Sequence, residues 1–269
     1  MNRIIRYLSG LAVAATVSIV SVPQAEAQQA DSRLYSITSS GKLRVCQYPL
    51  YYSISFRNPA TGEIEGIDAD LAKELAKELG AELEIVESSF GTFIADLQAD
   101  KCEIGMFGIG ATLQRAQAVA FTQPYLITSI YAVARAGGDV KSWADIDQPG
   151  LKVAVSLGSY IEPFMRDYLK NAELVVVAPP ATRESELVAN RVDVIMTDYP
   201  TAIKVTDEFD WAASIEPDEP LRLTPYAYVV PQGDQVWLNY VNQFIDTIKL
   251  DGRLVEFAEK NKLGPIVAP

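Results

Sequence analysis

Residues 107–125 contain the side chains best suited to chemistry, because two glycines are followed there by an arginine. We expect a buried apolar strand to end at Phe107, after which Gly108 and Gly110 let the backbone come close to another group. A helical turn that contains Arg115 should follow. Free backbone N–H groups, the positive end of a helix and a planar guanidinium would then point to one place and form an anion site. Taken alone, such an arginine is more often a solvated surface side chain. Whether it belongs to an anion site therefore depends on what the rest of the sequence indicates.

Two other residue types limit the chemistry of this 269-residue chain. There is no histidine, which excludes histidine-based triads and histidine-ligated metals and leaves Asp, Glu, Lys and Tyr for acid–base work. We expect no metal and no cofactor.

The cysteines are Cys46 and Cys102, and export would permit a disulfide. If strands 43–47 and 103–107 are parallel neighbours with level ends, however, the two Cα atoms lie about 10–13 Å apart, beyond the ~7 Å limit. We therefore expect free cysteines.

The overall composition is that of a globular protein. Apolar residues make up 49% of the chain and charged residues 22%, and the length allows one large domain or two modest ones. The formal net charge is −12. Such an acidic surface argues against binding to nucleic acid, which needs a basic face, and against docking on anionic lipid.

Residues 1–27 have the pattern of a secretory signal peptide. Arg3 and Arg6 form a basic start, a short apolar stretch follows, and an Ala-x-Ala cleavage motif ends at Ala27. No cysteine follows this motif directly, which argues against a lipid anchor. We expect cleavage near Ala27 and a periplasmic location in a Gram-negative cell.

The mature chain alternates strands and helices, which indicates parallel sheets covered on both faces. Residues 28–40 are polar and are expected to form a loose arm. Asp68 suits the N-cap of the first helix, which should run to about residue 79. Strands are expected at 43–47, 83–86, 103–107, 151–155, 173–177 and 192–196, with helices at 68–79, 90–98, 159–169, 182–190, 199–205, 234–250 and 253–261.

The strand–helix series occurs twice, before and after the glycine pair Gly137 and Gly138, so two similar lobes are expected. At this level the chain resembles the extracellular solute-binding proteins of family 3, which are polar amino-acid receptors of ABC importers. The resemblance runs from about residue 32 to about residue 263. The segments that carry it are Gly-Lys-Leu-Arg-Val at 41–45, Gly-Ile-Asp-Ala-Asp-Leu-Ala at 66–72, Phe-Ile-Ala-Asp-Leu-Gln at 93–98, the Arg115 segment, Phe-Thr-Gln-Pro-Tyr at 121–125, Val-Asp-Val-Ile-Met-Thr-Asp at 192–198 and Asp-Gly at 251–252.

The resemblance implies an α/β fold of the two-lobed periplasmic-binding-protein type (type II). In this fold two parallel-rich sheets are joined by a two-strand hinge and close on a ligand. Lobe 1 would comprise 33–126 plus 228–269, and lobe 2 would comprise 129–224. The implied function is a periplasmic solute-binding receptor, a monomer and not an enzyme. It would capture an amino acid or a related small carboxylate and deliver it to the membrane subunits of an ABC importer.

The family's ligand contacts can be carried over where the motifs match. Arg115 matches the arginine that grips the α-carboxylate of the ligand. Gly108 matches a position whose backbone faces the α-ammonium, and Asp198 matches the carboxylate that pairs with it. A simpler interpretation of Asp198 is an N-cap for the helix that follows.

Aromatic residues complete the implied pocket. Phe90 and Tyr51 match rings that sandwich the ligand, although either could be ordinary core. Tyr48 matches a position that in relatives often contacts the side chain of the ligand and so affects specificity. Together with Phe107 and Tyr160 these rings favour an apolar or ring-bearing ligand.

Two positions depart from the family pattern. Gly110 replaces a Thr or Ser hydroxyl that usually helps to hold the carboxylate, and Ser156 stands where several relatives carry a basic residue. Both departures weaken the case for an ordinary polar amino acid as the ligand.

The chain also resembles an enzyme with the same fold, the exported cyclohexadienyl dehydratase, a carbon–oxygen lyase that removes water and CO2 from prephenate or arogenate. The resemblance lies at 113–117, 146–150 and 196–198. It implies that Glu162 corresponds to the general acid, whereas the simpler interpretation is a glutamate that favours the positive end of a helix. The loop around Glu162 lacks the double glycine of the enzyme, so a receptor is the leading hypothesis. A ligand-sensing partner of a membrane receptor is a third.

Overall fold

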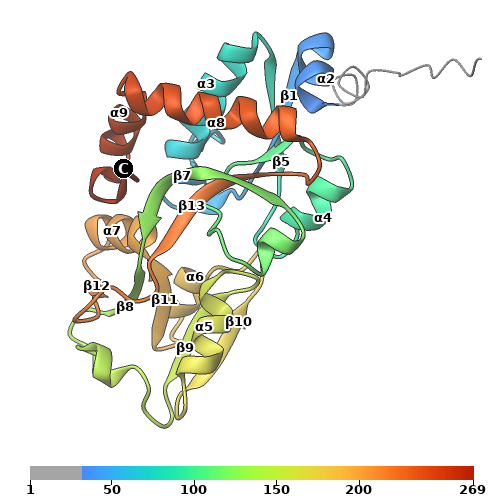
Figure 1. Cartoon of the computed structure of the whole chain (residues 1–269). Coiled ribbons are helices and arrows are strands. Elements are labelled where there is room, and N and C mark those ends of the chain that lie inside the picture. Colours follow the sequence, from blue (N-terminus) through green and yellow to red (C-terminus); the bar gives the residue numbers. More distant parts are fainter. Residues whose placement is uncertain (1–31) are drawn as a thin grey trace, which may run out of the picture.

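The computed structural model describes residues 32–269, so the expected signal peptide lies outside the described residues. Two five-stranded sheets form the centres of two lobes, which are the upper and lower halves of Figure 1. A third, three-stranded sheet consists of β2 (Leu50–Tyr51), β3 (Ser55–Arg57) and β4 (Ile64–Glu65). This architecture confirms the predicted α/β fold with two lobes.

The sheet of the first lobe has the order β5-β1-β6-β13-β7, in which β1, β5 and β6 are parallel and β13 is antiparallel to its neighbours. Its strands are β1 (Lys42–Gln47), β5 (Glu82–Glu87), β6 (Ile104–Gly105), β7 (Ala120–Thr128) and β13 (Thr224–Val230). The elements around it are α2 (Arg33–Ser40), α3 (Ile67–Leu79), α4 (Phe93–Gln98), the 3-10 turns η1 (Arg115–Gln117) and η3 (Gly264–Ile266), α8 (Gln235–Leu250) and α9 (Arg253–Lys260).

The sheet of the second lobe has the order β10-β9-β11-β8-β12, with a parallel core of β10, β9 and β11. Its strands are β8 (Ile130–Arg135), β9 (Lys152–Ser156), β10 (Glu173–Val177), β11 (Val194–Asp198) and β12 (Ala212–Ile215). The 3-10 turn η2 (Trp143–Asp145) and the helices α5 (Ile161–Tyr168), α6 (Arg183–Val188) and α7 (Tyr199–Glu208) accompany them.

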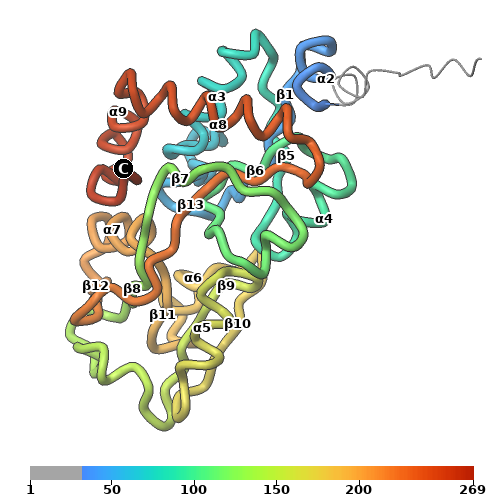
Figure 2. The backbone as a smooth tube through the Cα atoms, in the orientation of Figure 1, coloured from blue at the N-terminus to red at the C-terminus, as the bar shows by residue number. Residues whose placement is uncertain are grey.

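Two long strands, β7 and β13, connect the lobes. They pair antiparallel from Thr128 and Thr224 to Ala120 and Val230, and Figure 2 shows both running from the upper lobe to the lower one. The lobe boundaries 33–126 plus 228–269 and 129–224 stay a prediction.

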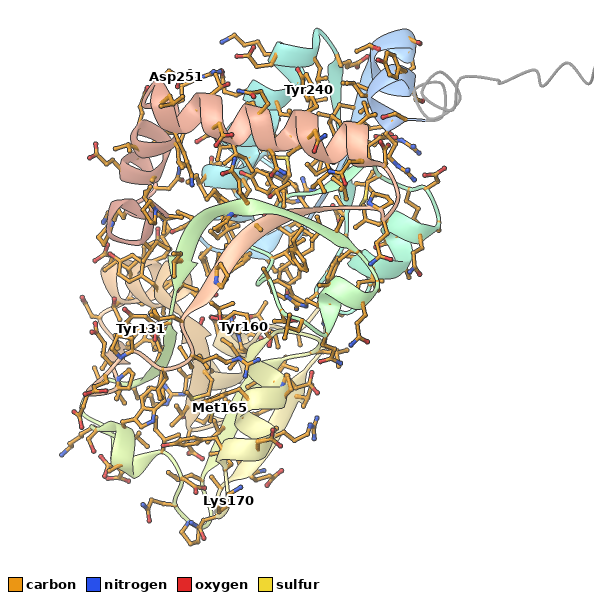
Figure 3. All side chains as sticks on the ribbon, viewed as in Figure 1. Tyr131, Tyr160, Met165, Lys170, Tyr240 and Asp251 are labelled. Atoms are coloured by element: carbon orange, nitrogen blue, oxygen red, sulfur yellow. A yellow bond between two sulfur atoms is a disulfide. The ribbon has the colours of Figure 1, made fainter. Side chains whose placement is uncertain are left out.

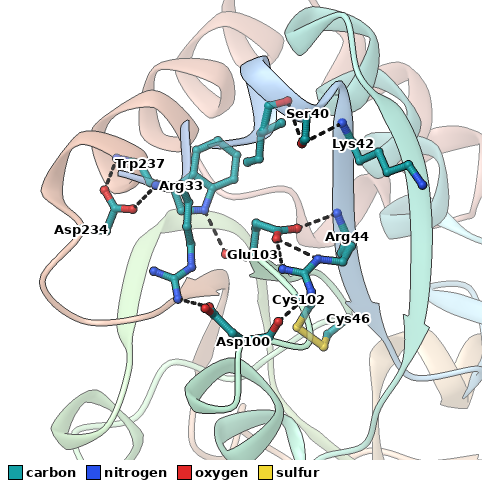
Figure 4. Close-up of polar contacts among 11 residues, drawn as sticks. Arg33, Ser40, Lys42, Arg44, Cys46, Asp100, Cys102, Glu103, Asp234 and Trp237 are labelled. Carbon is teal, nitrogen blue, oxygen red and sulfur yellow. Dashed lines mark hydrogen bonds and ion pairs between the residues drawn. A yellow bond between two sulfur atoms is a disulfide. The ribbon is translucent and has the colours of Figure 1, made fainter. Parts of the chain in front are cut away.

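Helix α8 covers the first sheet with the apolar stripe that its periodicity predicts. Trp237, Val241 and Phe244 are buried, as are the next members of the stripe, and Tyr240 is half-buried. The indole Nε1 of Trp237 donates a hydrogen bond of 2.9 Å to the carbonyl of Glu103 (Figure 4), which satisfies the polar atom of a fully buried ring. No helix among residues 32–269 is long and apolar enough to span a membrane.

Residues 33–40 form helix α2, so the expectation of a loose arm over 28–40 was wrong in this part. The Ser32 Oγ accepts from the backbone N–H of Leu34 and caps the helix. The Ser32 Oγ and the Arg33 N–H also donate to the two carboxylate oxygens of Asp234, each at 2.7 Å. Figure 4 shows the contact of Arg33 with Asp234. The partner lies about 200 positions away along the chain, so no local pattern reveals this contact.

Cys46 and Cys102 form a disulfide with a Cα–Cα distance of 5.6 Å (Figure 4), so the expectation of free cysteines was wrong. Strands β1 and β6 are parallel as predicted, with Cys46 opposite Gly105. The error lies in the path of the chain before β6. Only Ile104 and Gly105 belong to the strand, and Asp100, at a φ of +57°, turns the chain after α4. Cys102 therefore approaches Cys46 from a turn instead of lying in line with the strand.

Asp68 is not the N-cap of the first helix, which was also an expectation. Gly66 holds that position, and its positive φ of +125° brings its α-carbon against the backbone of Ile54. Asp68 lies in the first turn of α3 and is completely buried. Its carboxylate accepts hydrogen bonds from Gly108 N–H at 2.7 Å and from two tyrosine hydroxyls.

Candidate functional site

A cleft of about 730 Å³ opens between the two lobes. Both lobes and the connecting strand β13 line it, so a bound molecule would touch both lobes. Figure 3 shows Tyr160, one of the lining residues, at the level where the lobes meet. The side chains most relevant to binding are Phe90, Phe93, Arg115, Tyr160, Glu162 and Arg222.

Arg115 connects the two sides of this cleft. It belongs to η1, and only 8% of the residue is exposed. Its Nη1 donates to the carbonyl of Gly110 and its Nη2 to the carbonyl of Gly158, both at 2.8 Å. The guanidinium carbon lies 5.3 Å from the ring centre of Phe93 and 5.9 Å from that of Phe90. Burial lowers the pKa of Arg115 to about 10, so the side chain remains a cation at neutral pH.

The two glycines of the predicted anion loop serve aromatic packing. Gly108 has a φ of +60°, and a Cβ there would lie 2.8 Å from the ring of Tyr51. A Cβ on Gly110 would lie 2.9 Å from the ring of Tyr160. Such distances are too short for any side chain, so these glycines let one tyrosine of each lobe reach the interface.

Asp198 is the N-cap of α7, because its Oδ1 accepts from Thr201 N–H at 3.3 Å. The simpler interpretation of this residue therefore holds. The other oxygen, Oδ2, accepts from the hydroxyls of Tyr51 and Tyr226, which are 2.8 Å from each other. Asp198 thus joins the second lobe to the first lobe and to the connecting strand β13. Tyr226 was not predicted from the sequence, although it lies on the long strand β13 that connects the lobes.

Arg183 is a buried cation that the sequence analysis missed. Only 9% of the residue is exposed, and its Nη1 donates to the carbonyl of Met196 at 2.7 Å. Burial lowers the pKa of Arg183, but the nearby carboxylates of Glu184 and Asp198 outweigh this effect and raise it above the ordinary value. Arg183 directly follows the capping residue Thr182, a position that also suits a surface arginine. The sequence alone therefore does not show that its side chain is buried.

The structure brings four predicted aromatic residues together. The ring of Phe90 lies 5.2 Å from that of Tyr48, 5.6 Å from that of Tyr51 and 5.5 Å from that of Phe107. Tyr160 comes from the second lobe, with its ring 6.1 Å from that of Tyr226. Its buried hydroxyl approaches Tyr226 but has no partner at hydrogen-bond distance.

Glu162 and Arg115 both form hydrogen bonds with the backbone of Gly158. The Oε2 of Glu162 accepts from Gly158 N–H at 2.8 Å, and the carbonyl of the same glycine accepts from Arg115. Its Oε1 accepts from Arg166 at 2.7 Å, one turn further along α5. Both carboxylate oxygens of Glu162 therefore have a partner within the protein. Within residues 32–269, no group of three or more acidic or cysteine side chains is placed to hold a metal ion.

The cleft between the lobes, the buried arginine and the two connecting strands are the features of a two-lobed binding protein. The model of the family of bacterial extracellular solute-binding proteins, family 3, matches residues 43–263. The chain belongs to this family, and the family and the type II fold predicted from the sequence are confirmed.

Similar proteins include an enzyme and amino-acid-binding proteins. Cyclohexadienyl dehydratase of Pseudomonas aeruginosa is 30% identical over 90% of each chain. The histidine-binding periplasmic protein of Salmonella typhimurium is 26% identical over 81% of this chain and 86% of its own. Among solved structures, an ancestral amino-acid-binding protein described as a precursor of cyclohexadienyl dehydratase is 31% identical. It has a TM-score of 0.79 and covers 85% of this chain and 99% of its own.

Proposed function

We propose that this protein is a periplasmic receptor that closes its lobes on a small carboxylate and delivers it to the membrane subunits of an ABC importer. The observation that carries the proposal is the buried guanidinium of Arg115, which bonds to a carbonyl of each lobe. A ligand carboxylate that replaces these carbonyls would form a charge-assisted, bidentate pair, which is stronger than two neutral hydrogen bonds.

The names of the similar receptors support this proposal, because the histidine-binding relative is described as periplasmic. The acidic chain and the predicted cleavage near Ala27 are consistent with an exported protein. The expected contacts from Tyr48, Tyr51, Phe90, Gly108, Gly110, Tyr160 and Asp198 are part of the same proposal.

The test is ligand binding by an Arg115 variant. The protein is unfolded and refolded to remove any carried-over ligand, and amino acids and other small carboxylates are screened by thermal shift. For a compound that binds, Arg115→Ala should weaken binding by about 2–4 kcal/mol, since a buried charge would lose its partner. Arg115→Lys should also lose affinity, because a point charge cannot replace the planar fork.

A matched control is Arg191→Ala, which removes an exposed guanidinium paired with Glu186 in the second lobe. It should leave the dissociation constant unchanged. If Arg115→Ala also left it unchanged, the ligand would bind elsewhere and the proposal would fail.

A second candidate is a cyclohexadienyl dehydratase, which the 30% identical relative and the position of Glu162 in the cleft favour. A general acid must carry the proton that it donates. Both carboxylate oxygens of Glu162 already have protein partners, the N–H of Gly158 and the guanidinium of Arg166, so we place the receptor first. Formation of phenylpyruvate or phenylalanine from prephenate or arogenate, followed by ultraviolet absorbance, is the direct test. Turnover that disappears in Glu162→Gln while binding is retained would establish the enzyme.

A further inference from the structure

We infer that α7 and residues 259–268 form a second contact between the lobes, outside the Arg115 cleft, which controls how readily that cleft opens. We call it the outer contact. The inference rests on the proposed function, because it concerns the movement of the lobes around the proposed binding cleft. It depends on three features, namely the order of the chain segments across the connection, an ion pair between the lobes and the space beside that pair.

The connection between the lobes is wider than the strands β7 and β13. Tyr226 of β13 pairs with Leu126 of β7. On its other side Tyr226 forms an antiparallel bridge with Gly110, and on its other side Leu126 forms one with Val267. Gly110 belongs to the cleft, since its carbonyl accepts from Arg115. The cleft and the outer contact therefore lie at opposite edges of the same row of segments.

The outer contact is fixed to the first lobe and reaches the second. Leu263 and Ala268 are buried, and the Ala268 N–H donates to the carbonyl of Tyr125 in β7 at 3.0 Å. The Nζ of Lys262 lies 2.5 Å from Oδ2 of Asp207, which belongs to α7 in the second lobe. Figure 1 shows α7 and α9 to the left of β7 and β13, whereas α4 lies to their right.

Space remains beside this ion pair. Two hollows of about 490 and 480 Å³ both have Lys262 and Asp207 among their lining residues, and the smaller one also has Ile203 of α7 and Pro265. When a rotation about the connecting strands separates the two sides of the cleft, the surfaces at the opposite edge approach each other. They can do so only as far as the hollows allow, because packed protein is hardly compressible. Filling a hollow should therefore hinder opening of the cleft.

The ion pair is formed in the arrangement in which the two sides of the cleft touch. Arg115 donates to the carbonyl of Gly158, and a Cβ on Gly158 would lie 2.8 Å from the backbone of Gly91 in the first lobe. A rotation that separates these groups also displaces Asp207 relative to Lys262. The pair therefore favours the closed arrangement. Because both side chains are exposed, we expect a modest effect, a two- to fivefold change in the ratio of open to closed protein, or about 0.4–1 kcal/mol.

The test uses a thiol that is covered when the cleft is closed. Ser159 lines the cleft and is 7% exposed, and the native cysteines are joined in a disulfide, so Ser159→Cys introduces a free thiol. Protein that has been refolded without ligand is treated with an aromatic disulfide reagent that releases a coloured thiolate. The rate of this reaction measures the population in which the thiol is uncovered.

Two changes at the outer contact should alter this rate in opposite directions. Lys262→Ala should raise it about two- to fivefold. Ile203→Trp fills the smaller hollow and should lower it by a factor of about five or more, since overpacking would accompany opening. Ile203→Phe is a smaller replacement in case the tryptophan prevents folding. Exchange of the charges by Lys262→Asp with Asp207→Lys should return the rate to that of the reporter protein, which loss of packing alone would not do.

Matched controls change the same residue types elsewhere. Val255→Trp places a ring on an exposed position of α9 that lines neither hollow, and Lys77→Ala removes a lysine that pairs with Glu74 within α3. Both should leave the rate unchanged. A rate that Lys262→Ala left unchanged, or that the Ile203 replacements left unchanged or raised, would overturn the inference. The proposed function is tested separately by the Arg115→Ala screen, because that experiment needs a ligand and this one does not.

Discussion

Asp68 and Asp198 are two buried aspartates with the same kind of partners, two tyrosine hydroxyls and one backbone N–H, but they connect different parts of the molecule. Asp68 accepts from Tyr125 at 2.6 Å, from Tyr228 at 3.1 Å and from Gly108 N–H at 2.7 Å. All of these partners belong to the sheet of the first lobe or to the loop after β6. The Asp68 cluster therefore stays intact when the lobes move as rigid bodies.

The Asp198 cluster spans the moving parts. Asp198 ends β11 in the second lobe, Tyr51 belongs to β2 in the first lobe, and Tyr226 lies on β13 between them. Separation of the lobes has to break at least one of these hydrogen bonds. The same chemical motif thus serves rigidity at Asp68 and closure at Asp198.

The charge balance differs as well. Burial raises the pKa of Asp68 to about 7, and the three hydrogen bonds only partly oppose this effect. No cation within the described part of the chain contributes to the pKa of Asp68, whereas the carboxylate of Asp198 is one of the charges that raise the pKa of Arg183. Three experiments probe this contrast, beginning with the largest expected effect.

If the first lobe is the rigid region, loss of its disulfide should be the most damaging change. Replacement of Cys46 and Cys102 by serine removes a cross-link over 56 positions, and the loop-entropy relation gives a loss of about 4 kcal/mol in the free energy of unfolding. Urea unfolding of the oxidised protein and of the double variant measures this loss. Titration of the unfolded, unreduced protein should find no free thiol. Two thiols per chain in a monomer would contradict the cross-link.

Asp68 should make the stability of the protein depend on pH. The folded-state pKa of Asp68 is about 7, above the ordinary 3.8, so the folded protein binds a proton that the unfolded chain has released. The stability contributed by this proton is complete below about pH 4 and is lost as the pH rises towards about 7. The loss is at most about 1.4 kcal/mol per pH unit. Urea unfolding over this range should show a steeper decline for the native sequence than for Asp68→Asn.

The control for this experiment is Asp218→Asn, which changes an exposed aspartate of the second lobe. It should retain the decline of the native sequence. A decline that persisted unchanged in Asp68→Asn would assign the proton to another group.

The smallest expected effects separate two tyrosines that lie two positions apart on β13. Tyr228→Phe removes a hydroxyl from Asp68 and should lower the free energy of unfolding by about 1 kcal/mol without a change in ligand affinity. Tyr226→Phe removes a hydroxyl from Asp198 and should shift the protein towards the open arrangement. Small-angle scattering would detect this shift as a larger radius of gyration. If both variants changed the radius equally, the two clusters would not have different roles.

Local patterns predicted much of this structure. Apolar periodicity and glycine positions gave the order of strands and helices, and the stripe on α8 is buried nearly as expected. The two glycines followed by an arginine singled out Arg115, which lines the cleft in the structure. These features depend on residues that are close together in the sequence, where periodicity and turn chemistry carry information.

The remaining features depend on how distant segments meet. The disulfide follows from a turn at Asp100 that no spacing rule specifies. Asp68 lies only two positions after the true cap, Gly66, and a carboxylate at either position fits the start of a helix. Arg183 is buried because α6 packs against β11, which a single arginine after a capping threonine does not indicate.

The order of strands in the first sheet has a consequence for how the chain is made. Strand β13 lies between β6 and β7, although it follows them by about a hundred residues, so the earlier strands leave a gap that is filled only when residue 230 has emerged. The second sheet uses strands β8 to β12, which are consecutive in the sequence. Domains tend to fold as they are synthesised. In this protein the first lobe is the first to be synthesised and the last to be completed. The second lobe, which is inserted into it, can assemble while the first lobe still has unpaired strand edges.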